Sequence, residues 1–332
     1  MLKIALLDDY AGVAMDCAQW GRLEGKAEIT VFRDHMSEDL AAEALATFDV
    51  LCTIRERMAL PRTLIERLPN LKLVTIVGAR LTNLDLDAAS ERGVIVAHSG
   101  TRNPAFANVS AATPELAWGL LIATVRDIAG QDRRMRDGLW QDKVGTILAG
   151  RTLGLLGLGR IGKRIAEFGK VFGMEVIAWS QNLTAEAAAA VGVRRVEKDE
   201  LFAQADVISI HLVLSERSRG LVTARELGLM KPTAFLINTS RGPIMVEDDL
   251  IAALRGGVIA GAGLDVFDQE PPRPDHPLRT LENVTLTPHL GYATLDTLKA
   301  FYGDSLEAIE AFADGAPIRV SNPEALAKSA AP

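Results

Sequence analysis

The chain has 332 residues, of which 48% are hydrophobic, and it carries a formal net charge of −7 at pH 7. This length predicts about two domains, and the apolar content is sufficient for a buried core in each of them. The charge is spread without long like-charged blocks, which argues against nucleic acid or an anionic membrane surface as the main partner.

Targeting signals and structural crosslinks are not expected. The apolar N-terminus is interrupted by Asp8 and Asp9, and no apolar stretch approaches the ~20 residues that cross a bilayer, so the expected location is cytoplasmic. Cys17 and Cys52 are too few for a disulfide framework and match no metal-ligand spacing. We expect both cysteines to be small core residues in a reduced compartment, and we expect no metal site.

The first hundred residues alternate short apolar runs with helical patterns. The expected strands are Ile4–Leu7, Ile29–Phe32, Val50–Ile54, Leu73–Val77 and Val94–Ala97, and the expected helices are Glu38–Ala46, Pro61–Leu68 and Leu84–Glu91. Strands that alternate with helices predict right-handed βαβ crossovers and a parallel sheet covered on both faces.

The same alternation of apolar runs and helical patterns begins again after residue 150. The expected strands are Leu153–Leu156, Glu175–Ala178, Val207–Ile210, Ala234–Ile237, Val258–Leu264 and Val284–Leu286. The fold class is therefore α/β, with two doubly wound parallel sheets, one in each domain.

Two long helical stretches, Ala112–Ala123 and Leu295–Asp314, are expected to cross between the two halves. The C-terminal part then completes the first domain, so that residues 1–112 with 295–332 form one domain and residues 113–294 form an inserted one. The cleft between the domains is the default ligand site. The alanine-rich tail Asn322–Pro332 is expected to fray.

A G-x-G-x-x-G turn lies between an apolar strand and an amphipathic helix, in the run Gly157-Leu158-Gly159-Arg160-Ile161-Gly162. Gly157 permits the tight turn, Gly159 lets the backbone approach a phosphate, and Gly162 lets the helix pack close to the strand. The helix N-terminus points free N–H groups at the anion. A bare motif is weak, but this context favours a dinucleotide-binding loop over a merely structural turn.

Three side chains suited to carbonyl chemistry follow strands of the second half. Arg241 could bind a carboxylate, and a histidine such as His289 can donate and accept a proton when a carboxylate such as Glu270 fixes its tautomer. Each also has an ordinary interpretation, as a surface arginine, a histidine in a turn and a solvated loop acid. Their shared position after strands of one domain favours the catalytic interpretation.

These motifs, in order and spacing, resemble the D-isomer-specific 2-hydroxyacid dehydrogenase family, and the resemblance covers nearly the whole chain. It implies a Rossmann cofactor domain inserted in a flavodoxin-like substrate domain. It also implies that Arg241 holds a 2-keto acid, that His289 protonates the carbonyl oxygen during hydride transfer, and that Glu270 sustains the charged imidazole. Formate dehydrogenases of this superfamily carry glutamine in place of Glu270, which argues against formate as the substrate.

The resemblance extends to residues around the cofactor. Asp265 matches an aspartate near the nicotinamide carboxamide, Thr239 and Gly291 line the same cleft, and His211 matches a position near the ribose and pyrophosphate. His211 could also be a histidine at the edge of the core. The cofactor-binding set implied in this way is Gly157, Gly159, Arg160, Ile161, Gly162, Ser180, Gln181, His211, Thr239, Asp265 and Gly291.

The expected substrate loop of the first domain, Val77-Gly78-Ala79-Arg80, departs from the family pattern because it has one glycine and an added arginine. The N–H groups of Gly78 and Ala79 could still bind a carboxylate. Arg80 could bind a second anionic group of the substrate or pair with Asp85 or Asp87 on the surface. Arg55 matches a family position that touches substrate in some members, so a phosphorylated or dicarboxylic substrate is possible.

The ribose end of the cofactor site also departs from the usual pattern. About 20 residues beyond the glycines an NAD enzyme supplies an acid for the 2′-hydroxyl, but this chain has Ser180 followed by Gln181. A 2′-phosphate is then not repelled, yet no arginine follows at once to attract it. The sequence therefore predicts NAD and leaves NADP open.

Two functions are compatible with these motifs: a nicotinamide-dependent dehydrogenase acting on a small 2-hydroxy or 2-keto acid, and an NAD-sensing corepressor that keeps the fold without physiological turnover. Family members are commonly dimers through the cofactor domain. The resemblance therefore implies a homodimer, with the segment 117–148 and its Trp118 and Trp140 as the contact.

Overall fold

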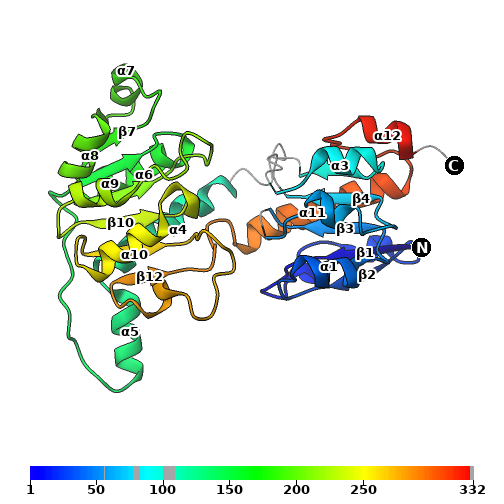
Figure 1. Cartoon of the computed structure of the whole chain (residues 1–332), viewed down its shortest axis with the longest axis horizontal. Coiled ribbons are helices and arrows are strands. Elements are labelled where there is room, and N and C mark those ends of the chain that lie inside the picture. The colour runs from blue at the N-terminus through cyan, green and yellow to red at the C-terminus, as the bar shows by residue number, and fades with distance from the viewer. Residues whose placement is uncertain (56, 78–82, 100–108, 330–332) are drawn as a thin grey trace. The chain divides into compact units, whose positions relative to one another are not determined.

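The computed structural model describes residues 1–55, 57–77, 83–99 and 109–329. The chain forms two compact units (Figure 1). Unit 1 consists of Met1–Val109 with Thr294–Pro332, and unit 2 of Ser110–Ala293, so unit 2 interrupts unit 1 in the sequence. None of the described helices combines the length and the apolar content that crossing a bilayer requires.

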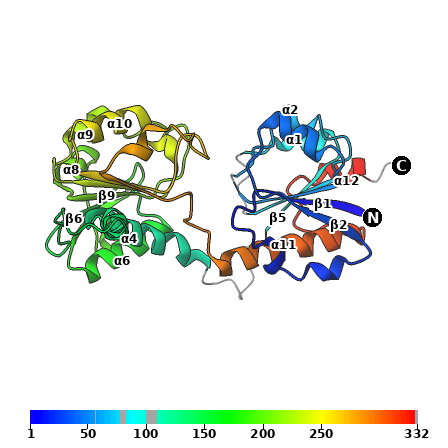
Figure 2. The ribbon, with the colours of Figure 1, turned by 90° about the horizontal axis from the view of Figure 1, so that it is seen from below.

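Unit 1 is built on a parallel sheet with strand order β2-β1-β3-β4-β5. Its described strands are β1 (Leu2–Leu6), β2 (Ala27–Val31), β3 (Val50–Thr53), β4 (Leu73–Ile76) and β5 (Ile95–His98). Its described helices are α1 (Glu38–Leu45), α2 (Arg62–Ile65), α3 (Leu86–Glu91), α11 (Leu295–Ala313) and α12 (Glu324–Ser329). Figure 2 shows α1 and α2 on one face of the sheet and α11 on the other. Strands β3 and β4 are accordingly buried along their whole length.

The C-terminal segment of unit 1 is anchored to the edge strand β5, so the expectation of a frayed tail is wrong for residues 322–329. The side chain of Asn322 is fully buried, accepts a hydrogen bond from the Val96 N–H at 2.9 Å and donates one to the Val94 carbonyl at 2.9 Å. These bonds satisfy polar groups that an edge strand would otherwise leave unpaired. α12 follows at once and buries Ala325, while residues 330–332 lie outside the described part.

Unit 2 contains a parallel sheet with strand order β12-β11-β10-β9-β6-β7-β8. Its strands are β6 (Thr152–Leu156), β7 (Glu175–Trp179), β8 (Arg194–Arg195), β9 (Val207–Ile210), β10 (Phe235–Asn238), β11 (Gly261–Leu264) and β12 (Val284–Leu286). Its helices are α4 (Ala112–Val125), α5 (Ile128–Arg136), α6 (Arg160–Val171), α7 (Ala185–Ala189), α8 (Lys198–Gln204), α9 (Ala224–Leu229) and α10 (Glu247–Arg255). Helices α8, α9 and α10 cover one face and α4 and α6 the other (Figure 2). The predicted pair of doubly wound parallel sheets is thus confirmed.

Each of the two long helices lies within one unit, contrary to the expectation that both cross between the two halves. α4 packs on α6, β10 and β11 of unit 2, and α11 packs on β4 and β5 of unit 1. Trp118 of α4 is buried, with its ring centroid 4.9 Å from that of Phe172 and 5.8 Å from that of Phe168. The apolar surface of α4 is therefore used inside its own unit, and Trp118 is a core residue. Cys17 and Cys52 are free and buried, as expected.

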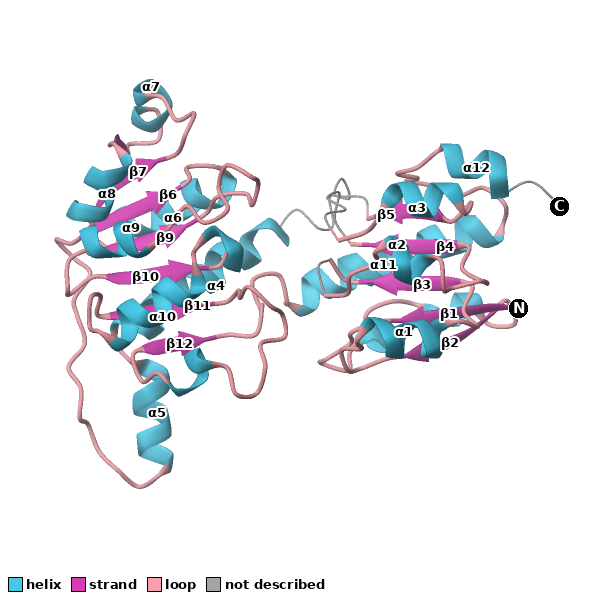
Figure 3. Ribbon diagram, in the orientation of Figure 1, coloured by secondary structure: helices cyan, strands magenta, loops and turns pink. Residues whose placement is uncertain are grey.

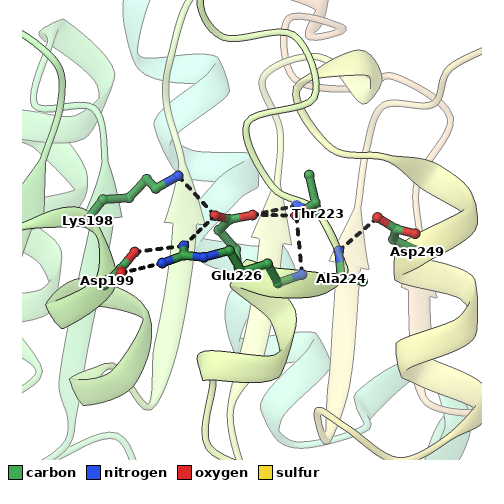
Figure 4. Close-up of polar contacts among 7 residues, drawn as sticks. Lys198, Asp199, Thr223, Ala224, Glu226 and Asp249 are labelled. Carbon is green, nitrogen blue, oxygen red and sulfur yellow. Dashed lines mark hydrogen bonds and ion pairs between the residues drawn. The ribbon is translucent and has the colours of Figure 1, made fainter.

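A buried carboxylate joins α8 to α9 in unit 2 (Figure 4). Glu226, which is 3% exposed, accepts hydrogen bonds from the Thr223 hydroxyl at 2.6 Å, from Lys198 Nζ at 2.9 Å and from Arg225 at 2.9 Å. The Thr223 backbone N–H also donates to it, which completes a capping box at the start of α9. Burial alone would raise the pKa of Glu226, but these hydrogen bonds outweigh it and lower the pKa to about 2.

Glu226 is expected to make the stability of unit 2 depend on pH. Its pKa falls from 4.5 in the unfolded chain to about 2 in the folded one, so its contribution is complete above pH 4.5 and is lost as the pH falls toward 2. Glu226→Gln should lower the free energy of unfolding by about 1–3 kcal/mol at pH 7, because an amide nitrogen then faces Lys198 or Arg225. Urea unfolding at pH 7 and pH 4 should show a smaller deficit at pH 4. The exposed Glu216→Gln is the matched control, and an equal deficit at both pH values would contradict the assignment.

Candidate active site

The glycine turn in unit 2 has the geometry of a phosphate cradle. Gly157 adopts φ +102°, and a Cβ there would lie 2.7 Å from the His211 carbonyl oxygen. A Cβ at Gly162 would lie 2.1 Å from the Gly157 carbonyl oxygen, whereas one at Gly159 would meet nothing within 4 Å. Gly159 is the N-cap of α6 and supplies no capping side chain, so the N–H groups of the first turn are open to an anion. These residues fit a dinucleotide pyrophosphate.

Substitution of Gly162 tests this cradle. The Cβ of Gly162→Ala would collide with a backbone carbonyl, which cannot move as a side chain can, so we expect at least about a tenfold weaker NADH affinity and a loss of about 1–3 kcal/mol in stability. Gly228→Ala is the matched control, since it lies in α9 with nothing within 4 Å of its added Cβ. Fluorescence titration with NADH measures the affinity, and unchanged binding by Gly162→Ala would contradict the cradle.

Residues expected around the rest of the dinucleotide lie at the ends of neighbouring strands. Ser180 follows β7, and its carbonyl accepts a hydrogen bond from the Leu183 N–H, which places it in a turn. His211 follows β9, its Nε2 lies 2.9 Å from Ser209 Oγ, and desolvation by burial lowers its pKa to about 3, so the ring is neutral near pH 7. Thr239 follows β10, and its buried hydroxyl has no hydrogen-bond partner among the described residues. An unsatisfied buried hydroxyl of this kind fits a ligand contact.

A glutamate–histidine pair lies beyond the carboxyl ends of the adjacent parallel strands β11 and β12. His289 Nδ1 is 2.5 Å from Glu270 Oε2, and Glu270 Oε1 accepts a hydrogen bond from the Phe267 N–H at 2.9 Å. A carboxylate can only accept, so Nδ1 carries the proton of this bond and Nε2 is left for proton exchange. The sequence placed these two residues on separate loops, and the structure brings them together as a dyad.

Asp265 fixes the loop that carries His289. Its carboxylate is fully buried and accepts hydrogen bonds from the Thr287 hydroxyl at 2.6 Å, from the Leu290 N–H at 2.7 Å and from the Gly291 N–H at 2.9 Å. Burial raises the pKa of Asp265, and these hydrogen bonds offset only part of that effect. Between these anchors His289 holds φ +53°, a left-handed conformation that neighbouring contacts must sustain. The sequence pointed to Asp265 only through the resemblance, and it gave no sign of this anchoring role.

Arg241 follows β10, the neighbour of β11 in the sheet. The Asn238 side chain donates a hydrogen bond to the Arg241 carbonyl at 2.9 Å, and the Arg241 guanidinium donates to the Ser240 carbonyl at 2.6 Å. A Cβ on the next residue, Gly242, would lie 2.1 Å from the carbonyl carbon of Phe267. The backbone that carries Arg241 therefore packs directly on the turn that leads to Glu270.

The expected substrate residues of unit 1 are described only in part. Arg55 follows β3 with φ +46°, a strained conformation for a residue other than glycine, and Val77 is buried after β4. Gly78, Ala79 and Arg80 lie outside the described residues. Both interpretations of Arg80 therefore stay predictions.

A glycine turn suited to phosphate at a helix N-terminus, with a glutamate–histidine pair at the carboxyl edge of the same parallel sheet, fits the class of nicotinamide-dependent dehydrogenases. The model of the family described as "D-isomer specific 2-hydroxyacid dehydrogenase, NAD binding domain" matches residues 118–291. The chain belongs to the D-isomer-specific 2-hydroxyacid dehydrogenase family, as its motifs predicted. It is an oxidoreductase that acts on CH–OH donors with a nicotinamide cofactor.

Named relatives agree on this class but differ in substrate. The chain is 38% identical to a glyoxylate reductase of Aeropyrum pernix over 76% of each chain. It is 37% identical to a D-3-phosphoglycerate dehydrogenase of Methanocaldococcus jannaschii over 84% of this chain, although it spans only 52% of that relative. The crystal structure of a phosphoglycerate oxidoreductase from Vibrio cholerae O395 superposes with a TM-score of 0.88 at 35% identity, over 95% of this chain and all of that one.

Proposed function

We propose that the chain reduces a small 2-keto acid to the D-2-hydroxy acid, with His289 as the general acid. The observation that carries this proposal is the 2.5 Å contact between His289 Nδ1 and Glu270 Oε2 at the carboxyl edge of the sheet that also holds the glycine cradle. A neutral carbonyl oxygen gains negative charge as it is reduced, so an adjacent acid that delivers a proton stabilises the transition state.

The proposed roles divide binding from proton transfer. Arg241 binds the substrate carboxylate through its guanidinium, and this contact orients the neighbouring carbonyl. His289 donates the Nε2 proton to the carbonyl oxygen, Glu270 stabilises the imidazolium before that transfer, and Asp265 keeps the histidine loop in place. The nicotinamide, when bound, supplies the hydride. We assign Arg55, Val77, Gly78, Ala79 and Arg80 to the substrate side of the reaction.

We propose NAD as the main cofactor, with NADP accepted. Support comes from the NAD-binding description of the family and from Ser180, a neutral residue where an acid would repel a 2′-phosphate. Ser180→Asp should lower the affinity for NADPH much more than that for NADH, measured as the two dissociation constants. Equal effects on both cofactors would contradict the position assigned to Ser180.

A substrate panel tests the function directly. Glyoxylate, hydroxypyruvate, pyruvate, 2-ketoglutarate and phosphohydroxypyruvate would each be mixed with NADH or NADPH while the absorbance of the reduced cofactor is followed. We expect turnover with at least one of them. Tight cofactor binding without turnover of any of these acids would contradict the reductase function and favour the corepressor function.

The role of Arg80 can be tested with the same acids. If Arg80 binds a second anionic group of the substrate, Arg80→Ala should raise KM mainly for the acids that carry such a group.

We further propose that the chain forms a homodimer through the segment 128–147 of unit 2, which projects from the rest of that unit (Figure 3). Large apolar side chains of this segment are exposed: Ile128 51%, Met135 56%, Leu139 49%, Trp140 75%, Val144 90% and Ile147 74%. Several large apolar side chains exposed within one segment are typical of a protein interface. Trp140→Ser with Val144→Ser should yield monomers in analytical ultracentrifugation, and Val171→Ser, on an 84% exposed side chain of α6, is the matched control. A dimer that survives the double substitution would exclude this contact.

The two free, buried cysteines suit a reducing compartment. We therefore propose a cytoplasmic location, which fractionation of the producing cells would test.

A further inference from the structure

A second glutamate–histidine pair lies next to the dyad and plays no part in the reaction described so far. Glu247 is the first residue of α10, and His276 precedes the 3-10 helix Pro277–Thr280. His276 Nε2 is 2.9 Å from Glu247 Oε1, and the two side chains are 14% and 19% exposed. Side chains this enclosed are held in one arrangement, unlike a pair on the open surface.

The Glu247 carboxylate also binds the turn that carries Glu270. Glu247 Oε2 accepts a hydrogen bond from the Asp268 N–H at 3.3 Å, while the preceding N–H, of Phe267, donates to Glu270 Oε1 at 2.9 Å. Two successive backbone donors are thus held by the two glutamates. A Cβ on Gly242 would lie 2.6 Å from the Asp268 nitrogen, so the turn is enclosed on that side as well.

The hydrogen bonds of His276 determine which of its two ring nitrogens carries the proton. The Leu278 N–H donates to His276 Nδ1 at 3.4 Å, so Nδ1 carries no proton and Nε2 donates to Glu247. His276 therefore orients the Glu247 carboxylate, and this leaves Oε2 aimed at the Asp268 N–H. The arrangement parallels the way in which outer residues orient the ligands of a metal site.

We propose that Glu247 and His276 are positioning residues that hold the Phe267–Glu270 turn, and through it the Glu270 carboxylate, in register with His289. This inference rests on the catalytic roles proposed above for Glu270 and His289. Loss of the pair would let the turn relax, and a displacement of about 1 Å at a catalytic group can cost about 100-fold in rate.

The experiment compares Glu247→Ala in two backgrounds, with glyoxylate and hydroxypyruvate as substrates. In the wild-type chain we expect kcat to fall about 10- to 100-fold, with KM and the NADH dissociation constant changed less than about threefold. In the Glu270→Gln background, where the positioned carboxylate is already absent, the same substitution should change kcat less than about twofold. His276→Gln, which keeps a donor toward Glu247, should retain most of the activity, whereas His276→Ala should behave like Glu247→Ala.

Asp248→Ala is the matched control, because Asp248 is an exposed carboxylate in the same first turn of α10. If Glu247→Ala impairs folding, as thermal unfolding would show, Glu247→Gln replaces it, since it keeps the volume and loses only one strong acceptor. A fall in kcat of the same factor in both backgrounds, or no fall in the wild-type chain, would overturn the positioning role. If Glu270→Gln itself leaves kcat unchanged, it is the proposed function that fails.

Discussion

Replacing His289 is expected to lower kcat by about 10²–10⁴-fold while the dissociation constant for NADH stays within about twofold of the wild-type value. The substitution removes the proton donor but leaves the glycine cradle, which lies on the loop after β6, unchanged. Single-turnover absorbance with saturating NADH measures the chemical step, and fluorescence titration measures cofactor binding. Retained turnover would refute the assigned role.

The backbone conformation at His289 determines which substitution removes the imidazole without also straining the loop. Its φ of +53° is tolerated by asparagine much better than by alanine. His289→Ala therefore removes the imidazole and also strains the loop, whereas His289→Asn removes the imidazole alone. If both variants lose activity equally, the loss belongs to proton transfer. Substantial recovery in His289→Asn would instead show that the loop conformation accounts for the defect.

The elements of both sheets could be predicted from the sequence because parallel strands covered on both faces appear as short, continuous apolar runs. β8 escaped prediction because it consists of Arg194–Arg195, which has no apolar run and pairs only at the sheet edge. The C-terminal tail was predicted incorrectly because its order depends on the burial of Asn322 against β5, more than two hundred residues away in sequence. Composition carries no sign of such a contact.

The positions of the proposed catalytic residues could be predicted because the sheet topology determines them. Arg241, Glu270 and His289 each follow a strand, and the carboxyl ends of parallel strands share one edge. The support around them could not be predicted in the same way. Glu247 reaches the Asp268 N–H across 21 residues, and Asp265 holds the backbone of Leu290 across 25. Acidic residues at such separations are common in any chain, so only the folded structure distinguishes Glu247 and Asp265 from the other acidic residues.

Arg241 offers the second large effect, because a guanidinium forms two parallel hydrogen bonds with a carboxylate and an ammonium group cannot. Each hydrogen bond to a charged group contributes about 1.5–3 kcal/mol, so Arg241→Ala is expected to lower kcat/KM by about 10²–10⁴-fold. Arg241→Lys should recover only part of this loss, since lysine restores the charge without the planar pair of donors. Steady-state kinetics with glyoxylate and NADH measure both variants, and the exposed Arg217→Lys is the matched control.

The division of the Arg241 effect between KM and kcat identifies its role. A residue that only binds the substrate carboxylate would raise KM and leave kcat unchanged, because it contacts the ground state and the transition state equally. We expect kcat to fall as well, since the Arg241–Gly242 backbone packs on the turn that leads to Glu270, and Arg241 and His289 follow strands of the same parallel sheet. Full kcat in Arg241→Lys at saturating substrate would limit Arg241 to binding.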